Sequence, residues 1–347
     1  MSRSRTGILL LNLGTPVAPE TGPVRRYLAE FLNDPRVLDI PTVPRALLLY
    51  GAILPFRPRQ SAHAYRKIWT NEGSPLLTAG RALAEKLAKR YGGAVPVELA
   101  MRYQEPSIRD ALARFQSAGV ERIVAVPLFP QYSSAATGSA LEALYAEAGR
   151  LHNVPSLQVV PAFYEHSAFL EAVATVARPV LAAFRPDRLL MSFHGLPVRQ
   201  VRKGDPTGTH CYQSENCCNA IGPENAFCYR AQCHATARGI AAALELPPGA
   251  WELAFQSRLG RIPWIEPYTD VRVVALARAG VRRLAVLCPA FVADCLETLE
   301  EIGIRARESF LAAGGEALEL VPCVNASEVW VGALVGLLGE TSPDLAR

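Results

Sequence analysis

Gly7-Ile8-Leu9-Leu10-Leu11-Asn12-Leu13 is the stretch that decides the fold. Its almost unbroken apolar character is typical of a strand buried on both faces of a parallel sheet. Similar runs recur along the chain and alternate with stretches of helical period. The expected strands are residues 7–13, 95–102, 121–128, 157–161, 188–193, 251–255 and 281–288. The expected helices are residues 76–90, 107–118, 168–185, 229–244, 268–279 and 327–339.

Strands joined by helices predict an α/β fold built on doubly wound parallel sheets. The series restarts at residues 157–161, so we expect two similar domains, which 347 residues can supply. The first domain is expected at residues 1–155, with the closing segment 325–347 packing back on it. The second is expected at residues 156–324 and contains a cysteine-rich segment at 205–235.

The composition is that of a packed globular protein, with 50% hydrophobic and 20% charged residues and a net charge of only +4. Scattered basic residues give no footprint for nucleic acid. The apolar run after the N-terminus, 7–11, is interrupted by Asn12, Gly14 and Pro16, too early for a signal peptide or a membrane span. We therefore expect a cytoplasmic protein whose thiols are reduced.

Five of the eight cysteines lie between Cys211 and Cys233. Four thiolates close together fit a tetrahedral sulfur site, which means zinc or an iron–sulfur cluster. Because the spacing lacks paired Cys-x-x-Cys knuckles, an iron–sulfur cluster is favoured. The expected ligands are Cys211, Cys218, Cys228 and Cys233, with Cys217 as the alternative to Cys218. Adjacent Cys217 and Cys218 are not expected to bind together, because their side chains would diverge.

His194 ends the apolar run that begins at Arg188 and is followed by Gly195 and Pro197. Glycine permits a tight turn and proline fixes the chain direction, so the imidazole can be held where a parallel strand opens onto a ligand cleft. A neutral imidazole binds iron and accepts protons. A structural histidine at a strand end is the alternative.

Three acidic residues, Asp294, Glu297 and Glu301, have the spacing i, i+3, i+7, which places them on one face of an α-helix. Such a stripe could pass a divalent cation inward. The alternative is that acids in a first helical turn simply complement the helix dipole.

The segment 41–59 is apolar, with arginines at its flanks, and is too short to span a bilayer. It could rest on a membrane surface or form a lip over an apolar ligand. A plain buried helix is the other interpretation.

The chain resembles ferrochelatases, which insert ferrous iron into a porphyrin to make haem, and the likeness runs nearly end to end. It is carried by residues 7–16, 31–37, 73–76, 101–103, 130–133, 137–139, 192–197, 255–258 and 263–264. The resemblance implies the chelatase fold of two Rossmann-like domains, with the porphyrin between them. It also implies a lyase that converts protoporphyrin IX and ferrous iron to haem b with release of two protons. Coproporphyrin III as the porphyrin, or cobalt or nickel as the metal, is the alternative.

The resemblance also implies roles for residues of this chain. His194 would be the main iron ligand or proton acceptor, facing Glu297 across the pocket, with Asp294 and Glu301 on an acidic path. The implied porphyrin-binding residues are Arg102, Tyr103, Tyr132, Ser133, Trp264 and Phe291.

Two departures from the family pattern stand out. Cys295 stands where family members often have a second histidine, which leaves fewer candidate proton carriers. The tail after Val324 has no cysteine, so a 2Fe–2S cluster would use the internal run alone, as in a minor branch of the family. We further expect a monomer or homodimer, with possible peripheral contact to the inner face of the membrane through residues 41–59.

Overall fold

A computed structural model describes residues 5–260 and 262–346, which form two compact units. Unit 1 holds residues 5–129, 134–162 and 325–346, and unit 2 holds residues 130–133, 163–260 and 262–324. Residues 1–4, 261 and 347 therefore lie outside the described residues. The domain limits expected from the sequence stay a prediction.

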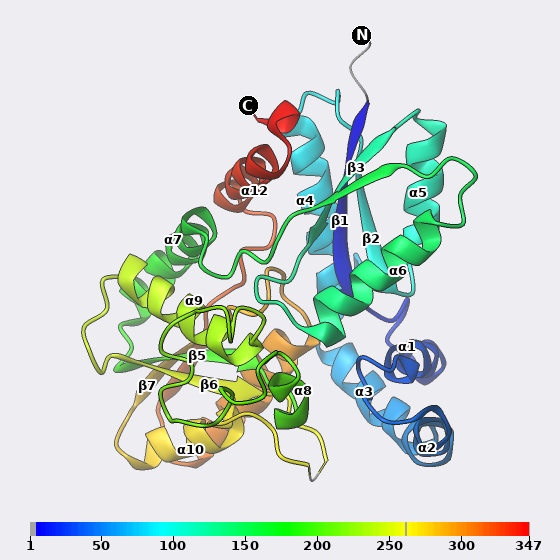
Figure 1. Ribbon diagram of the computed structural model, residues 1–347. Coiled ribbons are helices and arrows are strands. Elements are labelled where there is room, and N and C mark those ends of the chain that lie inside the picture. The colour runs from blue at the N-terminus through cyan, green and yellow to red at the C-terminus, as the bar shows by residue number, and fades with distance from the viewer. Residues whose placement is uncertain (1–4, 261, 347) are drawn as a thin grey trace. The chain divides into compact units, whose positions relative to one another are not determined.

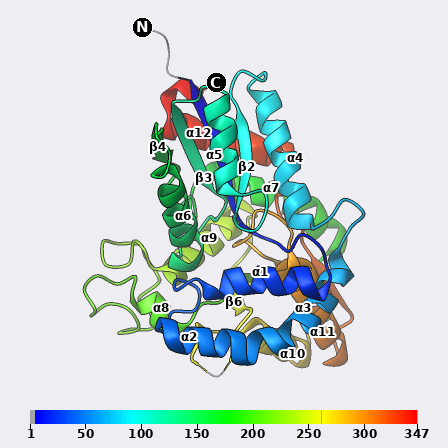
Figure 2. The same cartoon turned by 90° about the vertical axis from the view of Figure 1, so that its right-hand side faces the viewer.

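Unit 1 is built on a four-stranded parallel sheet of order β2-β1-β3-β4 (Figure 1). Its strands are β1 (Thr6–Gly14), β2 (Val97–Tyr103), β3 (Arg122–Pro127) and β4 (Ser156–Val159). Its α-helices are α1 (Thr21–Asn33), α2 (Thr42–Leu48), α3 (Leu54–Ile68), α4 (Pro75–Arg90), α5 (Ile108–Ser117), α6 (Ser139–Ala148) and α12 (Glu328–Thr341). Shorter helical turns are η1 (Leu49–Ile53), η2 (Ser134–Gly138) and η4 (Pro343–Leu345). Figure 2 shows α1 and α3 side by side, with α2 continuing into α3 through η1.

Unit 2 repeats this plan with a parallel sheet of order β6-β5-β7-β8. The strands are β5 (Arg188–His194), β6 (Trp251–Gln256), β7 (Arg283–Leu287) and β8 (Ala317–Leu320). The helices are α7 (Ser167–Phe184), α8 (Val198–Arg202), α9 (Tyr229–Ala243), α10 (Thr269–Arg278), the π-helix η3 (Glu297–Ala306) and α11 (Arg307–Ala312). By length and composition alone, α7 is the one helix in the described part of the chain that could cross a membrane.

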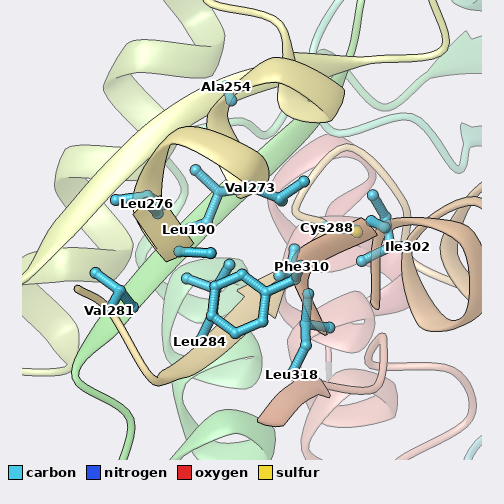
Figure 3. Packing of buried hydrophobic residues seen from close by; sticks show 13 residues of the cluster. Leu190, Ala254, Val273, Leu276, Val281, Leu284, Cys288, Ile302, Phe310 and Leu318 are labelled. Carbon is cyan, nitrogen blue, oxygen red and sulfur yellow. The ribbon is translucent and has the colours of Figure 1, made fainter. Parts of the chain in front are cut away.

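Buried apolar residues from the strands and helices of unit 2 form one core (Figure 3). The ring of Phe310 lies among Leu284, Leu318 and Leu190, and all four are 2% exposed or less. Cys288 belongs to the same cluster and packs there as a small apolar side chain. This packing fixes the ends of β5, β6 and β7, from which the site residues extend.

The structure confirms the α/β class and the parallel sheets, and it corrects two strand assignments. The strand predicted at 157–161 was placed in the second set, but β4 pairs with β3 of the first sheet, so that assignment was wrong. Strand β8 completes the second sheet and was not predicted. A hydrophobic run indicates a buried strand but does not indicate which sheet it joins, and four-residue β8 is too short for a clear pattern.

Candidate active site

The candidate site of unit 2 lies at the carboxyl ends of β5 and β7. These two strands are neighbours in the sheet, and the chain leaves them toward opposite sides, to β6 and to β8. This point, where the strand order reverses, is the usual ligand site of an open parallel sheet. His194 is the last residue of β5, and the segment 288–296 leads from β7 into η3. The topology of one unit therefore brings the elements of His194 and Glu297 together.

The imidazole of His194 is half-buried and held by its own backbone. Its Nδ1 lies 2.6 Å from the carbonyl oxygen of Gly195. Because a carbonyl oxygen only accepts hydrogen bonds, Nδ1 carries the proton in this contact, and the neutral ring presents the lone pair of Nε2. The ring of Phe291 lies edge-on, 6.3 Å away between centroids. The arrangement leaves one ring nitrogen for a metal ion or a proton.

Gln256 links the strand of His194 to the helix of Glu297. It is the residue opposite His194 in the pairing of β5 with β6, and it is 2% exposed. Its Nε2 donates to the backbone oxygen of Glu297 at 2.8 Å, and its Oε1 accepts from the hydroxyl of Ser192 at 2.7 Å. Gln256 was not predicted from the sequence as a site residue. The available signal was an amide directly after the apolar residues Leu253, Ala254 and Phe255 of the strand.

The other two acidic residues are held by different partners. Asp294 Oδ1 accepts from the Thr298 hydroxyl at 3.1 Å. Glu301 accepts from the backbone N–H of Ser257 at 2.8 Å and from its hydroxyl at 2.5 Å. The predicted single stripe on an α-helix is wrong, because Asp294 precedes the helix and η3 is a π-helix, whose hydrogen bonds run i→i+5. Their roles in an acidic path stay predictions.

Trp264 lies against the turn that follows His194. Its indole N–H donates to the carbonyl oxygen of Leu259 at 2.8 Å. A Cβ atom on Gly195 would lie 3.3 Å from the Trp264 ring and 2.8 Å from the carbonyl oxygen of Gln256. Glycine at position 195 therefore allows this close approach of ring and backbone.

Tyr132 and Ser133 belong to unit 2, although they follow β3 in the chain. The backbone N–H of Tyr132 donates to Gln232 Oε1 at 2.6 Å, and its ring meets that of Phe227 edge-on at 5.3 Å. Helix α9 thus holds the short loop that carries them. Ser133 is 8% exposed.

Arg102 and Tyr103 lie in unit 1, in a buried polar network around Asp34. Arg102 Nη2 and the Tyr103 hydroxyl each donate to Asp34 Oδ2 at 2.9 Å, and the Ser139 hydroxyl donates to the same oxygen at 2.5 Å. Burial raises the pKa of Asp34, but hydrogen bonds from Ser139, Arg36 and Tyr103 and the charge of Arg102 hold that pKa below its usual value. Tyr103 is 0% exposed, and the porphyrin-binding roles of Arg102 and Tyr103 stay predictions.

The cysteine-rich segment brings four thiols of unit 2 close together. The thiol of Cys228 makes hydrogen bonds with those of Cys211 and Cys218, which lower the pKa of Cys228 to about 3. The sulfur atoms of Cys217 and Cys218 lie 3.8 Å apart. The expectation that these adjacent side chains diverge is therefore wrong, because the turn at residues 215–218 places the two sulfur atoms close together.

Cys233 stands apart from these four thiols. It is fully buried in α9, and its thiol is paired with the Tyr229 hydroxyl. Arg230 Nη1 lies 3.2 Å from the sulfur of Cys218 and supplies a positive charge beside it. Within the described residues, no three His, Cys, Asp or Glu side chains are placed to hold a single metal ion.

Comparisons with known proteins agree with this fold and with the resemblance seen in the sequence. The ferrochelatase family model matches residues 5–342. A ferrochelatase of Pseudomonas fluorescens is 48% identical over 95% of this chain and 96% of its own length. A ferrochelatase of Stutzerimonas stutzeri is 49% identical over the same shares. Among solved structures, the sirohydrochlorin chelatase SirB of Bacillus subtilis subspecies spizizenii, in complex with cobalt, has the same fold.

That structure aligns with a TM-score of 0.52 and 12% identity over 98% of this chain and 96% of SirB. At this identity, the likeness concerns the fold alone. The match of the family model and of relatives near 48% identity extends over almost the whole length. The chain belongs to the ferrochelatase family.

Proposed function

We propose that this protein inserts ferrous iron into protoporphyrin IX to form haem b, with release of two protons. The observation that carries the proposal is the Nε2 atom of His194, which has no hydrogen-bond partner among residues 5–260 and 262–346 and lies where the strand order of unit 2 reverses. Gln256 holds the backbone of Glu297 next to the same strand ends. An imidazole and carboxylates suit a reaction in which a metal ion enters and protons leave.

The reaction requires that two pyrrole N–H protons leave the macrocycle while its nitrogen atoms take up iron. Neutral His194 accepts a proton at Nε2 and becomes the imidazolium, whose Nδ1–H already donates to Gly195. Binding free energy at the rim of the porphyrin holds the ring in the strained shape that exposes its nitrogen lone pairs. Phe291 and Trp264, next to His194, are the apolar surfaces of unit 2 suited to that contact.

Ferrous iron must exchange water for nitrogen ligands stepwise, and carboxylate oxygens are suitable transient partners. Glu297 and Glu301 supply such oxygens along η3, with Asp294 at its start. Burial, together with the nearby Glu297, raises the pKa of the Cys295 thiol. Cys295 thus stays protonated and leaves proton transfer to His194.

Anaerobic absorbance assays test the activity and the substrate. Purified protein is mixed with ferrous iron and either protoporphyrin IX or coproporphyrin III, and loss of the free-porphyrin bands is followed. We expect turnover with ferrous iron and a preference for protoporphyrin IX, measured as kcat/KM. Faster turnover of coproporphyrin III would replace the substrate assignment. Turnover with cobalt or nickel and none with iron would overturn the activity.

We propose further that the cysteine-rich segment holds a 2Fe–2S cluster through Cys211, Cys217, Cys218 and Cys228. Each iron of such a cluster takes two thiolates. Two ligands about 2.3 Å from a tetrahedral metal lie about 3.8 Å apart, which is the spacing of Cys217 and Cys218. Cys211 and Cys228 form the second pair. Relative to the ligand set expected from the sequence, Cys217 replaces Cys233.

The segment around these thiols is ordered by its own polar contacts. Asp205 accepts hydrogen bonds from the backbone N–H groups of Thr207, His210 and Cys211 at 2.8–2.9 Å. These bonds hold the pKa of Asp205 well below its usual value and order the start of the segment. A 2Fe–2S cluster would supply one-electron redox chemistry and a cross-link there. Metal insertion needs no electron transfer, so no step is assigned to it.

Residues 41–59 are the proposed membrane contact of this protein, which we place in the cytoplasm. Exposed apolar side chains gather there: Val43 (70% exposed), Leu47 (70%), Leu48 (41%), Tyr50 (61%) and Phe56 (76%). Beside them is a hollow of about 310 Å³ lined by Arg25, Arg26, Ala29, Tyr50, Leu54 and Pro55. Exposed apolar residues next to arginines fit the interface of an anionic bilayer.

Vesicle flotation checks this contact. We expect the protein to float with phosphatidylglycerol vesicles and the double variant Leu47→Gln/Phe56→Gln to stay in the soluble fraction. The matched control is Val154→Gln/Val271→Gln, which removes exposed apolar side chains elsewhere (60% and 52% exposed). Equal flotation of the first double variant and the unmodified protein would reject this surface. The same preparations, analysed by sedimentation, distinguish the monomer from the homodimer.

A further inference from the structure

The hydroxyl of Tyr229 makes a direct contact with the backbone of His194. Tyr229 is the first residue of α9, is 7% exposed, and donates its hydroxyl hydrogen to the His194 carbonyl oxygen at 2.8 Å. The two residues are 35 positions apart in the chain. A buried carbonyl oxygen at the end of a strand needs such a partner, since the ladder no longer supplies one.

The contact completes a clamp on one peptide unit. The His194 carbonyl oxygen accepts from Tyr229, and the N–H of the same peptide bond, that of Gly195, donates to the carbonyl oxygen of Gln256 at 2.7 Å. The next carbonyl oxygen, that of Gly195, receives Nδ1 of the imidazole. The 194–195 peptide is therefore held on both sides, one residue before the carbonyl oxygen against which the ring is aligned.

Tyr229 itself is held by the cysteine-rich segment. Cys228 precedes it, is the N-cap residue of α9, and shares hydrogen bonds with the thiols of Cys211 and Cys218. On the other side, the Tyr229 hydroxyl lies within hydrogen-bond reach of the Cys233 thiol. The phenol ring thus has little freedom to follow a movement of His194.

We propose that Tyr229 is a positioning residue for His194: its hydroxyl fixes the 194–195 peptide, and through it the direction of the imidazole Nε2. The functional part rests on the proposed role of His194 in metal insertion. The variant Tyr229→Phe keeps the aromatic ring but loses the hydrogen bond to the His194 carbonyl oxygen. We expect kcat to fall about tenfold or more, as for other residues that orient a reacting group. The KM for porphyrin should stay within about twofold, because Tyr229 is buried and only 7% exposed.

The matched control is Tyr91→Phe. Tyr91 is also buried, and its hydroxyl donates to a backbone carbonyl oxygen, that of Leu345, at 3.1 Å in unit 1. The Tyr91→Phe variant loses the same kind of hydrogen bond, but in unit 1, whereas His194 belongs to unit 2. A loss of kcat shared by both variants would assign the effect to stability and overturn the proposal.

A measurement on the substrate-free protein separates the positioning role from the activity. The imidazole Cε1 proton of His194 is assigned by its disappearance in His194→Asn. We expect Tyr229→Phe to shift this resonance, and Tyr91→Phe to leave it unchanged. An unshifted His194 resonance in Tyr229→Phe would overturn the positioning role. Failure of the unmodified protein to metallate porphyrin would instead overturn the proposed function, while the resonance still reports on the clamp.

Discussion

Replacement of His194 by alanine is expected to abolish metal insertion while the protein remains folded. General base catalysis by a positioned imidazole contributes about 10²–10⁴-fold to a rate, and His194 would also lose its role as an iron ligand. We therefore expect kcat in the anaerobic assay to fall by at least about 10³-fold. Because His194 is only half-buried, the free energy of unfolding should change by less than about 2 kcal/mol.

The control for this experiment is His152→Ala, an exposed histidine in the loop before β4. It should leave both the rate and the stability unchanged. Urea unfolding followed by circular dichroism reports the stability of each variant. Full activity of His194→Ala would refute the assigned role. Partial recovery of the variant by added imidazole would confirm that an imidazole nitrogen at this position carries the role.

The sequence was sufficient to predict much of the fold, because the signals it carries are local. Runs such as 7–13 and 188–193 are apolar without alternation, and in the structure they are the central strands β1 and β5. Predicted helix limits, such as 76–90 against α4 (Pro75–Arg90), differ by a residue. The pairing of β4 with the first sheet depends instead on contacts between residues distant in the sequence, and a hydrophobic pattern carries no information about such pairing.

In the candidate site, too, the sequence predicted the features that have a local signal. The position of His194 at the end of β5 could be predicted, because a polar residue after an apolar strand and before a glycine is such a signal. Its partners could not, because Gln256 and Tyr229 reach it through sheet pairing and a side-chain contact 35 residues away along the chain. The helix type of η3 was also hidden, since the i, i+3, i+7 spacing of its carboxylates assumes an α-helix. The ordering of these side chains is a property of the tertiary structure.

The cysteine-rich segment shows why the directions of two adjacent side chains cannot be predicted from their spacing in the sequence alone. In an extended chain, neighbouring side chains point to opposite faces, which argued against Cys217 and Cys218 binding together. Residues 215–218 instead form a turn with bends on either side, and the backbone N–H of Cys217 lies 3.4 Å from the carbonyl oxygen of Ser214. The two sulfur atoms then lie on the same side, 3.8 Å apart. The choice between Cys217 and Cys233 as the fourth ligand is therefore open to a direct test.

Cys217→Ser is expected to remove the cluster, and Cys233→Ser is expected to retain it. Purified without oxygen, the unmodified protein should be red-brown and carry about two irons and two sulfides per chain, as a 2Fe–2S cluster requires. Loss of one thiolate from an iron should leave Cys217→Ser nearly colourless, with iron and sulfide near zero. Cys233 is fully buried and paired with Tyr229, so its replacement removes no ligand.

The readouts are visible absorbance, iron and sulfide content, and zinc content. The opposite pattern, colour lost only in Cys233→Ser, would restore the ligand set expected from the sequence. A colourless unmodified protein with one zinc would reject the cluster.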